Sequence, residues 1–208
     1  MTAEATFRAK APGVMAKLLS DFPIGVEDAA AVLGNLGHES AGFTKLQEER
    51  PVVKGSKGGW GWAQWTGPRR RAFEAYCKRN KLDPASDKAN YAYLFVELRG
   101  YEGSEKAAIG KTVAAKGLDA KVEAFERAFL RAGVKHYDSR KQWARIALDA
   151  WQKAGNPSEL PPADDIPHHP EQPQAKPPAR MGWKGWLAIV GFLLVLVFAF
   201  LAFNLRVF

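Results

Sequence analysis

A run of 21 residues without a charge, from Gly185 to Leu205, most constrains what this chain can fold into. The run consists almost wholly of Leu, Val, Phe, Ala and Ile. As a helix it would rise about 30 Å, the thickness of a hydrocarbon core. Trp183 and Trp186 stand at its start, where indole side chains commonly anchor a span at the membrane interface. We therefore expect a single C-terminal transmembrane helix over 183–205.

A proline-rich stretch separates this run from the rest of the chain. Eight of the 13 prolines lie between Pro157 and Pro178. Such a stretch is extended and semi-rigid, and it does not build a core. We therefore divide the chain into a folded domain over 1–155, a proline-rich linker over 156–182 and the membrane segment. A domain of this length can bury a sizeable core.

Composition excludes several classes of protein. The one cysteine, Cys77, allows no internal disulfide, and no Cys/His cluster has the spacing of zinc ligands. We therefore expect no metal site. The formal net charge of +8 favours polyanionic partners, which include nucleic acid, anionic lipid and the bacterial envelope.

Hydrophobic periodicity indicates a mostly α-helical domain. Helices are predicted after Gly25, from Gly67 onward, and over 88–99, 118–131 and 140–153. The stretch between Gly55 and Gly67 is rich in Gly and Trp, which predicts a loop or a short hairpin. We expect a mostly α fold whose other element is a small β-hairpin or a Gly/Trp loop.

Glu39 stands out because of its place on the helix predicted after Gly25. It lies three residues after Leu36 and six after Leu33, on or near the apolar stripe that faces the core. A carboxylate there costs free energy unless it is paired or protonated, and a protonated carboxylic acid suits general acid catalysis. The alternative interpretation is a glutamate that caps a nearby group at the helix end.

A second carboxylate and an aromatic loop follow. Glycoside hydrolysis uses two carboxylates, one to protonate the leaving oxygen and one to activate water or stabilise the cation-like sugar. Glu48 comes nine residues after the first carboxylate. The loop then holds Trp60, Trp62 and Trp65 among glycines, together with Gln64. Indoles present flat faces to sugars and an amide both donates and accepts hydrogen bonds, so this composition indicates carbohydrate binding.

The stretch 34–69 resembles the lysozyme-like superfamily of peptidoglycan-cleaving enzymes, most closely the phage tail lysozyme and endolysin type. In that superfamily a helix ends in the catalytic Glu of a Glu-Ser motif, which here is Glu39-Ser40. A Gly-x-x-Gln motif lines the glycan cleft, and it is matched by 61–64. A Gln-Trp-Thr-Gly-x-Arg run is matched by 64–69, and looser matches follow at 95–98, 125–127 and 140–147. The resemblance implies substrate contacts from these residues: His38, Phe43, Trp60, Trp62, Gln64, Trp65 and Arg69.

The segment from His38 to Phe43, followed by Glu48, is also similar to the paired-Glu segment of phage endolysins in glycoside hydrolase family 19. That similarity implies Glu39 as the acid, Glu48 as the base and Thr66 as the residue that positions the attacking water. The chain between the second Glu and the Gly/Trp loop is far shorter here than in that family. Glu49 is therefore an alternative to Glu48.

The resemblance implies a phage-type endolysin that hydrolyses the glycan strand of bacterial peptidoglycan, lyses the host cell and needs no cofactor. A lysozyme or muramidase, a glucosaminidase and a lytic transglycosylase all fit the motifs. The alternative is a virion-associated or non-catalytic peptidoglycan-binding module. A basic nucleic-acid-binding membrane protein, suggested by Arg69-Arg70-Arg71, is a more distant alternative, and we expect no nucleic-acid partner.

Charges near the expected span predict where the protein resides. Lys176, Arg180 and Lys184 precede the span and Arg206 alone follows it. Because positive flanks stay in the cytoplasm, we expect a single-pass anchor in the inner membrane of the bacterial host. The first thirty residues have no recognisable signal peptide, which favours a domain held in the cytoplasm until lysis. The alternative is export of the domain in spite of the small charge bias.

Overall fold

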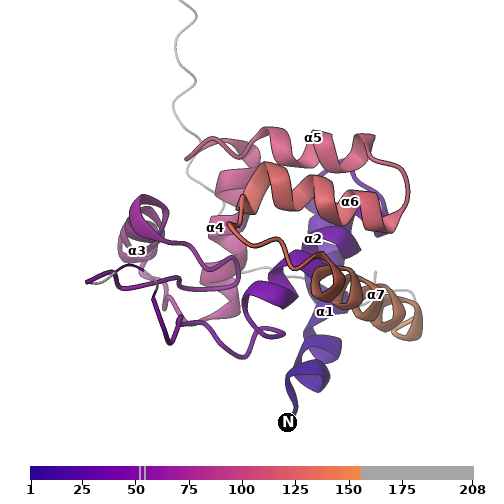
Figure 1. Cartoon of the computed structure of the whole chain (residues 1–208), viewed down its shortest axis with the longest axis horizontal. Helices are drawn as coiled ribbons and strands as arrows, with labels where there is room; N and C mark the ends of the chain where they lie inside the picture. The colour runs from indigo at the N-terminus through magenta and orange to yellow at the C-terminus, as the bar shows by residue number, and fades with distance from the viewer. Residues whose placement is uncertain (52, 54, 156–208) are drawn as a thin grey trace, which may run out of the picture. The chain divides into compact units, whose positions relative to one another are not determined.

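Helix α2 (Val26–Glu39) is the central element of the computed structural model, which describes residues 1–51, 53 and 55–155. Every residue from 28 to 37 is buried, so this helix is enclosed on all its faces (Figure 1). Small residues let its neighbours approach closely. A Cβ added to Gly34 would lie 2.5 Å from the Cβ of Ala144, and one added to Gly37 would lie 2.8 Å from the ring of Phe7. These contacts fix α2 against the helices on either side.

The remaining helices surround α2 or form a second group beside it. In chain order they are α1 (Ala3–Asp21), α3 (Gly67–Asn80), α4 (Asp87–Arg99), α5 (Ala107–Ala114), α6 (Leu118–Phe125), the π-helical turn η1 (Glu126–Leu130) and α7 (Tyr137–Lys153). Helices α1, α6 and α7 pack on α2, and α5 lies beside α6. The mostly α class predicted from the sequence is confirmed.

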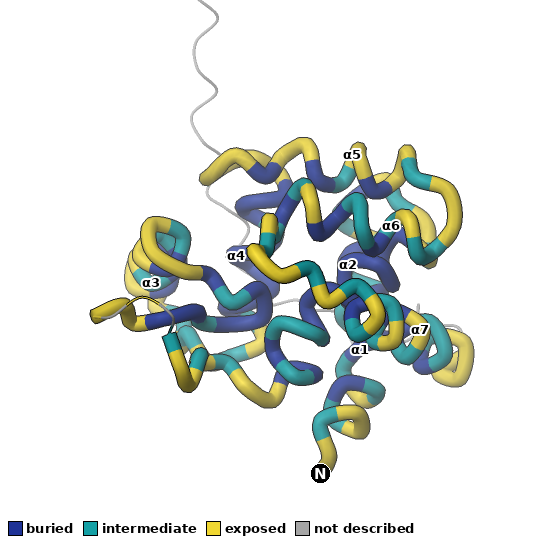
Figure 2. Tube along the Cα trace, viewed as in Figure 1, coloured by how far each residue is buried: buried dark blue, intermediate teal, exposed yellow. Residues whose placement is uncertain are grey.

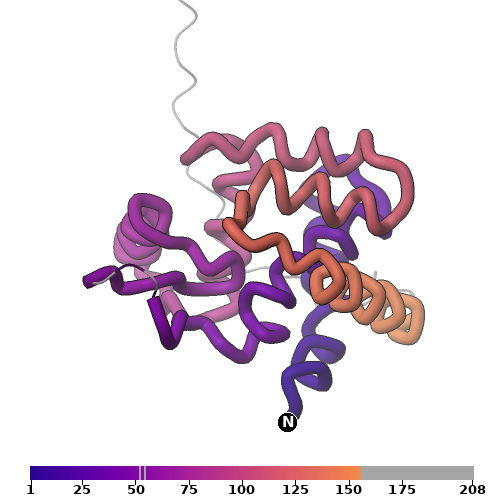
Figure 3. The backbone as a smooth tube through the Cα atoms, viewed as in Figure 1, coloured from indigo at the N-terminus to yellow at the C-terminus, as the bar shows by residue number. Residues whose placement is uncertain are grey.

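The Gly/Trp segment is a loop in which the described residues form no β-strand. The chain leaves α2, runs through this loop and returns to begin α3 (Figure 3). Two isolated antiparallel bridges shape it, one between Gln47 and Trp60 and one between Trp60 and Trp65. Of the two forms that the sequence allowed, the loop is therefore the one observed.

Two helical details differ from the sequence prediction. The helix expected over 118–131 ends as an α-helix at Phe125 and continues as η1, whose last residue is followed by Arg131 with φ of 56°. Helix α5 was not predicted, because it is only eight residues long and contains Gly110. Its stability comes from packing against α6 rather than from its own propensity.

The core is rich in aromatic side chains, and burial is most continuous along α2 and α4 (Figure 2). One aromatic group joins the loop to α3 and α4: Trp65 stacks on Phe73 at 4.8 Å and meets Tyr93 edge-on at 5.2 Å. A second group joins α1 to the turn after α2, where Phe7 lies 5.1 Å from Phe43.

The predicted transmembrane helix requires a correction. Across residues 1–51, 53 and 55–155, no helix combines the length and the apolar character needed to cross a membrane. The structure gives no support to the predicted C-terminal span, to the single-pass anchor in the inner membrane or to the membrane as a partner, and these predictions are withdrawn. The segment 183–205 and the linker 156–182 lie outside the described residues.

Candidate functional site

Glu39 is the last residue of α2, and a tight turn follows it. The hydroxyl of Ser40 donates to the carbonyl of Leu36 at 2.7 Å and accepts from the backbone N–H of Phe43 at 3.0 Å. Three successive residues, 41 to 43, have positive φ, and a Cβ added to Gly42 would lie 2.6 Å from the carbonyl oxygen of Ala3. The Glu-Ser-Ala-Gly-Phe sequence therefore ends the helix sharply and holds its last side chain at a fixed place.

The carboxylate of Glu39 is paired with a buried arginine from α7. Nη2 of Arg140 donates to Oε1 of Glu39 at 2.7 Å, and the two side chains are 1% and 17% exposed, respectively. Within the described part of the chain, the other oxygen, Oε2, accepts no hydrogen bond. The partly exposed carboxylate is thus held on one side only.

Arg140 is itself held by two further acceptors. Its Nε donates to the carbonyl oxygen of Lys135 at 2.6 Å, and its Nη1 donates to Oδ1 of Asn35 at 3.3 Å. Asn35 is completely buried, and its Nδ2 donates to the carbonyl oxygens of Ala31 and Val122, each at 3.0 Å. The guanidinium therefore connects α2, α6 and α7 to the carboxylate.

His38 lies beside this pair. Its Nδ1 is 2.9 Å from the hydroxyl oxygen of Ser139, and its ring centroid is 5.2 Å from that of His136. Burial, followed by the charges of Arg140 and His136, lowers the pKa of His38 to about 4. The imidazole is therefore neutral at neutral pH.

Glu48 and Glu49 differ in their surroundings. Oε2 of Glu48 accepts a hydrogen bond from the backbone N–H of Gly59 at 2.7 Å, which ties the start of the loop to its Gly/Trp part. Glu49 is 69% exposed and forms an ion pair with Lys45 at 2.9 Å. No hydrogen bond or ion pair between described residues joins either carboxylate to Glu39.

Thr66 and Gln64 lie at the end of the loop. Thr66 is exposed and occupies the N-cap of α3, where its hydroxyl makes no capping bond. Gln64 has φ of 47°, and its Nε2 donates to the carbonyl oxygens of Leu46 and Gly61 at 3.0 and 2.9 Å. Gln64 therefore braces the loop from inside.

The tryptophans expected to face sugars are mostly core residues. Trp62 and Trp65 are each 1% exposed, and Phe43, at 4.5 Å from the Trp62 ring, is also buried. Nε1 of Trp62 is the single buried side-chain polar atom of the described residues that lacks a hydrogen-bond partner. Trp60 is half-buried, and its Nε1 donates to the carbonyl of Pro84 at 3.3 Å. Of the indoles in the loop, Trp60 alone keeps a partly accessible face.

Arg69 is also part of the scaffold. Its Nε and Nη2 donate to the two carboxylate oxygens of Glu97, each at 2.8 Å, and its Nη1 donates to the carbonyl of Phe129 at 3.1 Å. Nε1 of Trp65 donates to the same carboxylate at 2.6 Å. Burial raises the pKa of Glu97 in spite of these donors. We therefore assign Arg69 to the junction of α3, α4 and η1 rather than to a cleft.

The sequence did not predict that Asn35 and Arg140 would take part in the Glu39 site. Asn35 precedes Glu39 by four residues on the same helix, so the spacing i, i+4 was available as a signal. Arg140 had no local signal, because its partner lies 101 residues away. Among the described residues, no group of three or more His, Cys, Asp or Glu could hold a metal ion.

Comparison with known proteins gives one match. The family model described as phage tail lysozyme matches residues 12–151, which include Glu39, the loop and Arg140. No curated protein and no solved structure matches the chain.

Proposed function

Since the chain belongs to the phage tail lysozyme family, a family of peptidoglycan-lytic phage proteins, we propose that it hydrolyses the glycan strand of bacterial peptidoglycan with Glu39 as general acid. The observation that carries this proposal is the pair of Glu39 and Arg140 at the end of α2. A partly exposed carboxylate held by a buried cation is a preorganised group that can meet a substrate.

The arrangement suits proton transfer to a leaving oxygen. In the form that reacts, Oε2 of Glu39 carries the proton that is transferred, since Oε1 is bound to Arg140. As the proton leaves, negative charge develops on the carboxylate, and the guanidinium at 2.7 Å stabilises it. Arg140 thereby favours the product of the transfer without moving.

Residues of the loop activate and hold the attacking water. Glu48 serves as general base through Oε1, because its Oε2 already accepts from Gly59. Thr66 holds the water with its exposed hydroxyl, which is not used for capping. The accessible face of Trp60 and the ring of His38 contact the sugars, while Phe43, Trp62, Gln64, Trp65 and Arg69 support the loop and the turn from inside.

The conservative variant Glu39→Gln tests the acid. Purified peptidoglycan sacculi are digested and the released fragments are identified by mass spectrometry. We expect the wild type to release glycan fragments with new reducing ends and Glu39→Gln to release none, while its helical circular dichroism is unchanged. The exposed variant Glu4→Gln is the control and should retain full activity. Full activity of Glu39→Gln would refute the proposal, and anhydro ends would identify a transglycosylase instead.

A second candidate function is favoured by the family's description, which names a tail lysozyme. In that case the chain is carried in the virion and opens the wall at infection, rather than acting as an endolysin at lysis. Mass spectrometry of purified virions distinguishes the two. Peptides of this chain in virions support the virion-associated role, and their presence only in lysates supports the endolysin.

A further inference from the structure

A fully buried carboxylate that the proposed mechanism does not use lies in the π-helical turn η1. Glu126 is 0% exposed. Its Oε1 accepts from the backbone N–H of Ala132 at 2.8 Å and from Nζ of Lys135 at 3.1 Å, and its Oε2 accepts from the hydroxyl of Tyr137 at 3.1 Å. Each donor belongs to the connection between η1 and α7 or to the first residue of α7. Glu126 therefore fixes this connection from its interior side.

The same connection holds the arginine of the candidate site. Lys135 contacts Glu126 with its side chain and Arg140 with its backbone, because the carbonyl oxygen of Lys135 accepts from Nε of Arg140 at 2.6 Å. The backbone N–H of Arg140 also donates to the carbonyl oxygen of His136 at 3.2 Å. A shift of the connection would therefore move the guanidinium.

A second link reaches Arg140 from α2, the helix that ends in Glu39. Asn35 accepts from Arg140 and donates to the carbonyl oxygen of Val122, which lies one turn before Glu126. The guanidinium is thus fixed against α6 and η1 through Asn35 on one side and through Lys135 on the other. π-Helical turns are frequent at functional sites, where they redirect the chain that follows.

We propose that Glu126 is a positioning residue for Glu39, and that it acts through Lys135 and Arg140. The inference rests on the proposed function, because it concerns the same carboxylate. Glu126 touches no substrate, and its role is to hold the connection 131–136 so that Nη2 of Arg140 meets Oε1 of Glu39. Among the described residues, Lys135 alone forms hydrogen bonds with both Glu126 and Arg140. The charge on Glu126 is needed because it holds the ammonium group of Lys135.

Kinetics of single and double variants test this role. Rates of reducing-end release are measured over a range of concentrations of solubilised glycan strands, and kcat and KM are compared. Glu126→Gln is expected to lower kcat at least tenfold with KM changed less than twofold. Arg140→Lys keeps the charge but loses the Nε donor to Lys135. In that background, Glu126→Gln should lower kcat less than twofold, since the path is already broken.

Two further variants separate positioning from simple stability. The side chain of Lys135 is 42% exposed, so Lys135→Met should fold and should reproduce the fall in kcat. Lys135→Arg, which keeps the charge, should retain most of the wild-type kcat. Asp28→Asn is the matched control, because Asp28 is also buried and pairs with Lys121 but contacts neither the connection 131–136 nor Arg140. It should lower the melting temperature and leave kcat unchanged.

The outcomes that overturn the inference are distinct from those that refute the function. Unchanged kcat in Glu126→Gln or Lys135→Met, or an equal fall of kcat in the wild-type and Arg140→Lys backgrounds, rejects the positioning role while Glu39→Gln remains inactive. An active Glu39→Gln rejects the proposed function itself.

Discussion

Arg140 binds Glu39 from a position that solvent does not reach. The guanidinium is 1% exposed and lies 2.7 Å from a carboxylate that is 17% exposed. A buried arginine needs acceptors for its donors, and the three it has here are two side-chain oxygens and one carbonyl. The pair is therefore both a part of the core and a part of the candidate site.

Loss of this pair should reduce both stability and activity. Arg140→Gln leaves the carboxylate of Glu39 and the oxygens of Asn35 and Lys135 without their donor, which should cost about 3–5 kcal/mol in the free energy of unfolding. Peptidoglycan cleavage should fall at least tenfold. Urea denaturation and release of glycan fragments measure the two effects. Arg145→Gln on the same helix is the control: its pair with Asp119 is exposed, so a loss below about 1 kcal/mol is expected. Equal losses in both variants would contradict the assignment.

Arg69 should act on stability rather than on substrate affinity. Arg69→Ala leaves Glu97, which is 1% exposed, with an uncompensated charge, and about 3–5 kcal/mol should be lost. Arg71→Ala, two residues later and exposed, should change stability by less than about 0.5 kcal/mol. Thermal unfolding compares the two variants. A raised KM in Arg69→Ala with unchanged stability would instead place this side chain against the substrate.

The two neighbouring glutamates should behave differently. Glu48→Gln keeps an acceptor for the N–H of Gly59 but removes the charge, so activity should fall about 100-fold, as is typical for loss of a general base, while the fold is retained. Glu49→Gln removes only an exposed pair with Lys45 and should stay within twofold of the wild type. Digestion of sacculi measures both variants, and the reverse result would assign the base to Glu49.

His38 should make stability depend on pH in acid. Its pKa is about 4 in the folded protein and about 6.5 when unperturbed, so the unfolded chain binds the extra proton between these values. The stabilisation contributed by neutral His38 is therefore fully present above pH 6.5 and is lost as the pH falls towards 4. The groups that face the ring are Arg140, His136 and the hydroxyl of Ser139.

The His38→Gln variant isolates this effect. Urea unfolding between pH 4 and 7 should show a shallower decline for His38→Gln than for the wild type. His136→Asn serves as control, since asparagine tolerates the positive φ at this position, and it should keep most of the decline. Parallel curves for the wild type and His38→Gln would show that His38 does not control the decline.

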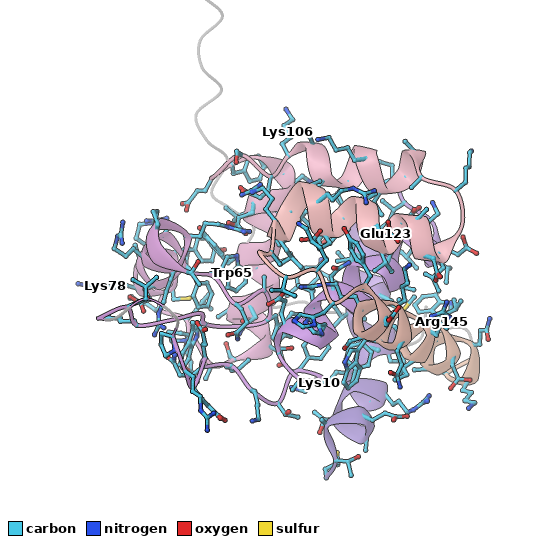
Figure 4. All side chains as sticks on the ribbon, in the orientation of Figure 1. Lys10, Trp65, Lys78, Lys106, Glu123 and Arg145 are labelled. Atoms are coloured by element: carbon cyan, nitrogen blue, oxygen red, sulfur yellow. The ribbon has the colours of Figure 1, made fainter. Side chains whose placement is uncertain are left out.

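Charge is concentrated in one part of the sequence. Residues 45–81 hold ten Lys or Arg and three Glu, a net of +7, against +8 for the whole chain. On α3 and directly after it, Arg71, Lys78 and Lys81 are exposed and form no ion pair with any described residue. Lys78 points away from the helix in Figure 4. This surface should attract an anionic polymer.

Binding of the Glu39→Gln protein to sacculi checks this expectation, because the proposed function predicts that this variant binds without cleaving. Replacing the three cations by Gln should weaken binding and make it less sensitive to salt, because fewer ions are exchanged. A matched control replaces Lys106, Lys111 and Lys116, three exposed cations on and next to α5, and changes the net charge equally. Equal weakening by both triple variants would show that only the net charge matters.

Local patterns predicted the mostly helical class and one residue of the candidate pair. The apolar stripe of α2 and the Glu-Ser turn placed Glu39 at a helix end, as the structure shows. The other residue, Arg140, depends on contacts between distant segments. A bidentate or buried pair leaves no periodic trace in the sequence, so neither this arginine nor Glu126 could be assigned a role beforehand.

The aromatic loop shows why composition alone was misleading. Three indoles within six residues were expected to remain exposed, yet the loop turns at Gly61 and Gln64, both with positive φ. Trp62 thereby enters the group around Phe43, and Trp65 enters the group around Phe73. The loop distributes its indoles between two regions of one core.

The distance along the chain between Glu39 and Arg140 has a consequence for biosynthesis. A ribosome delivers the carboxylate early and its cationic partner 101 residues later. Until the second segment emerges and α7 docks on α2, the nascent protein carries the carboxylate of Glu39 without its cationic partner. We therefore expect synthesis intermediates and proteolytic fragments that stop before residue 140 to be inert towards the cell wall, so that lytic capacity arises only once nearly the whole domain has been translated.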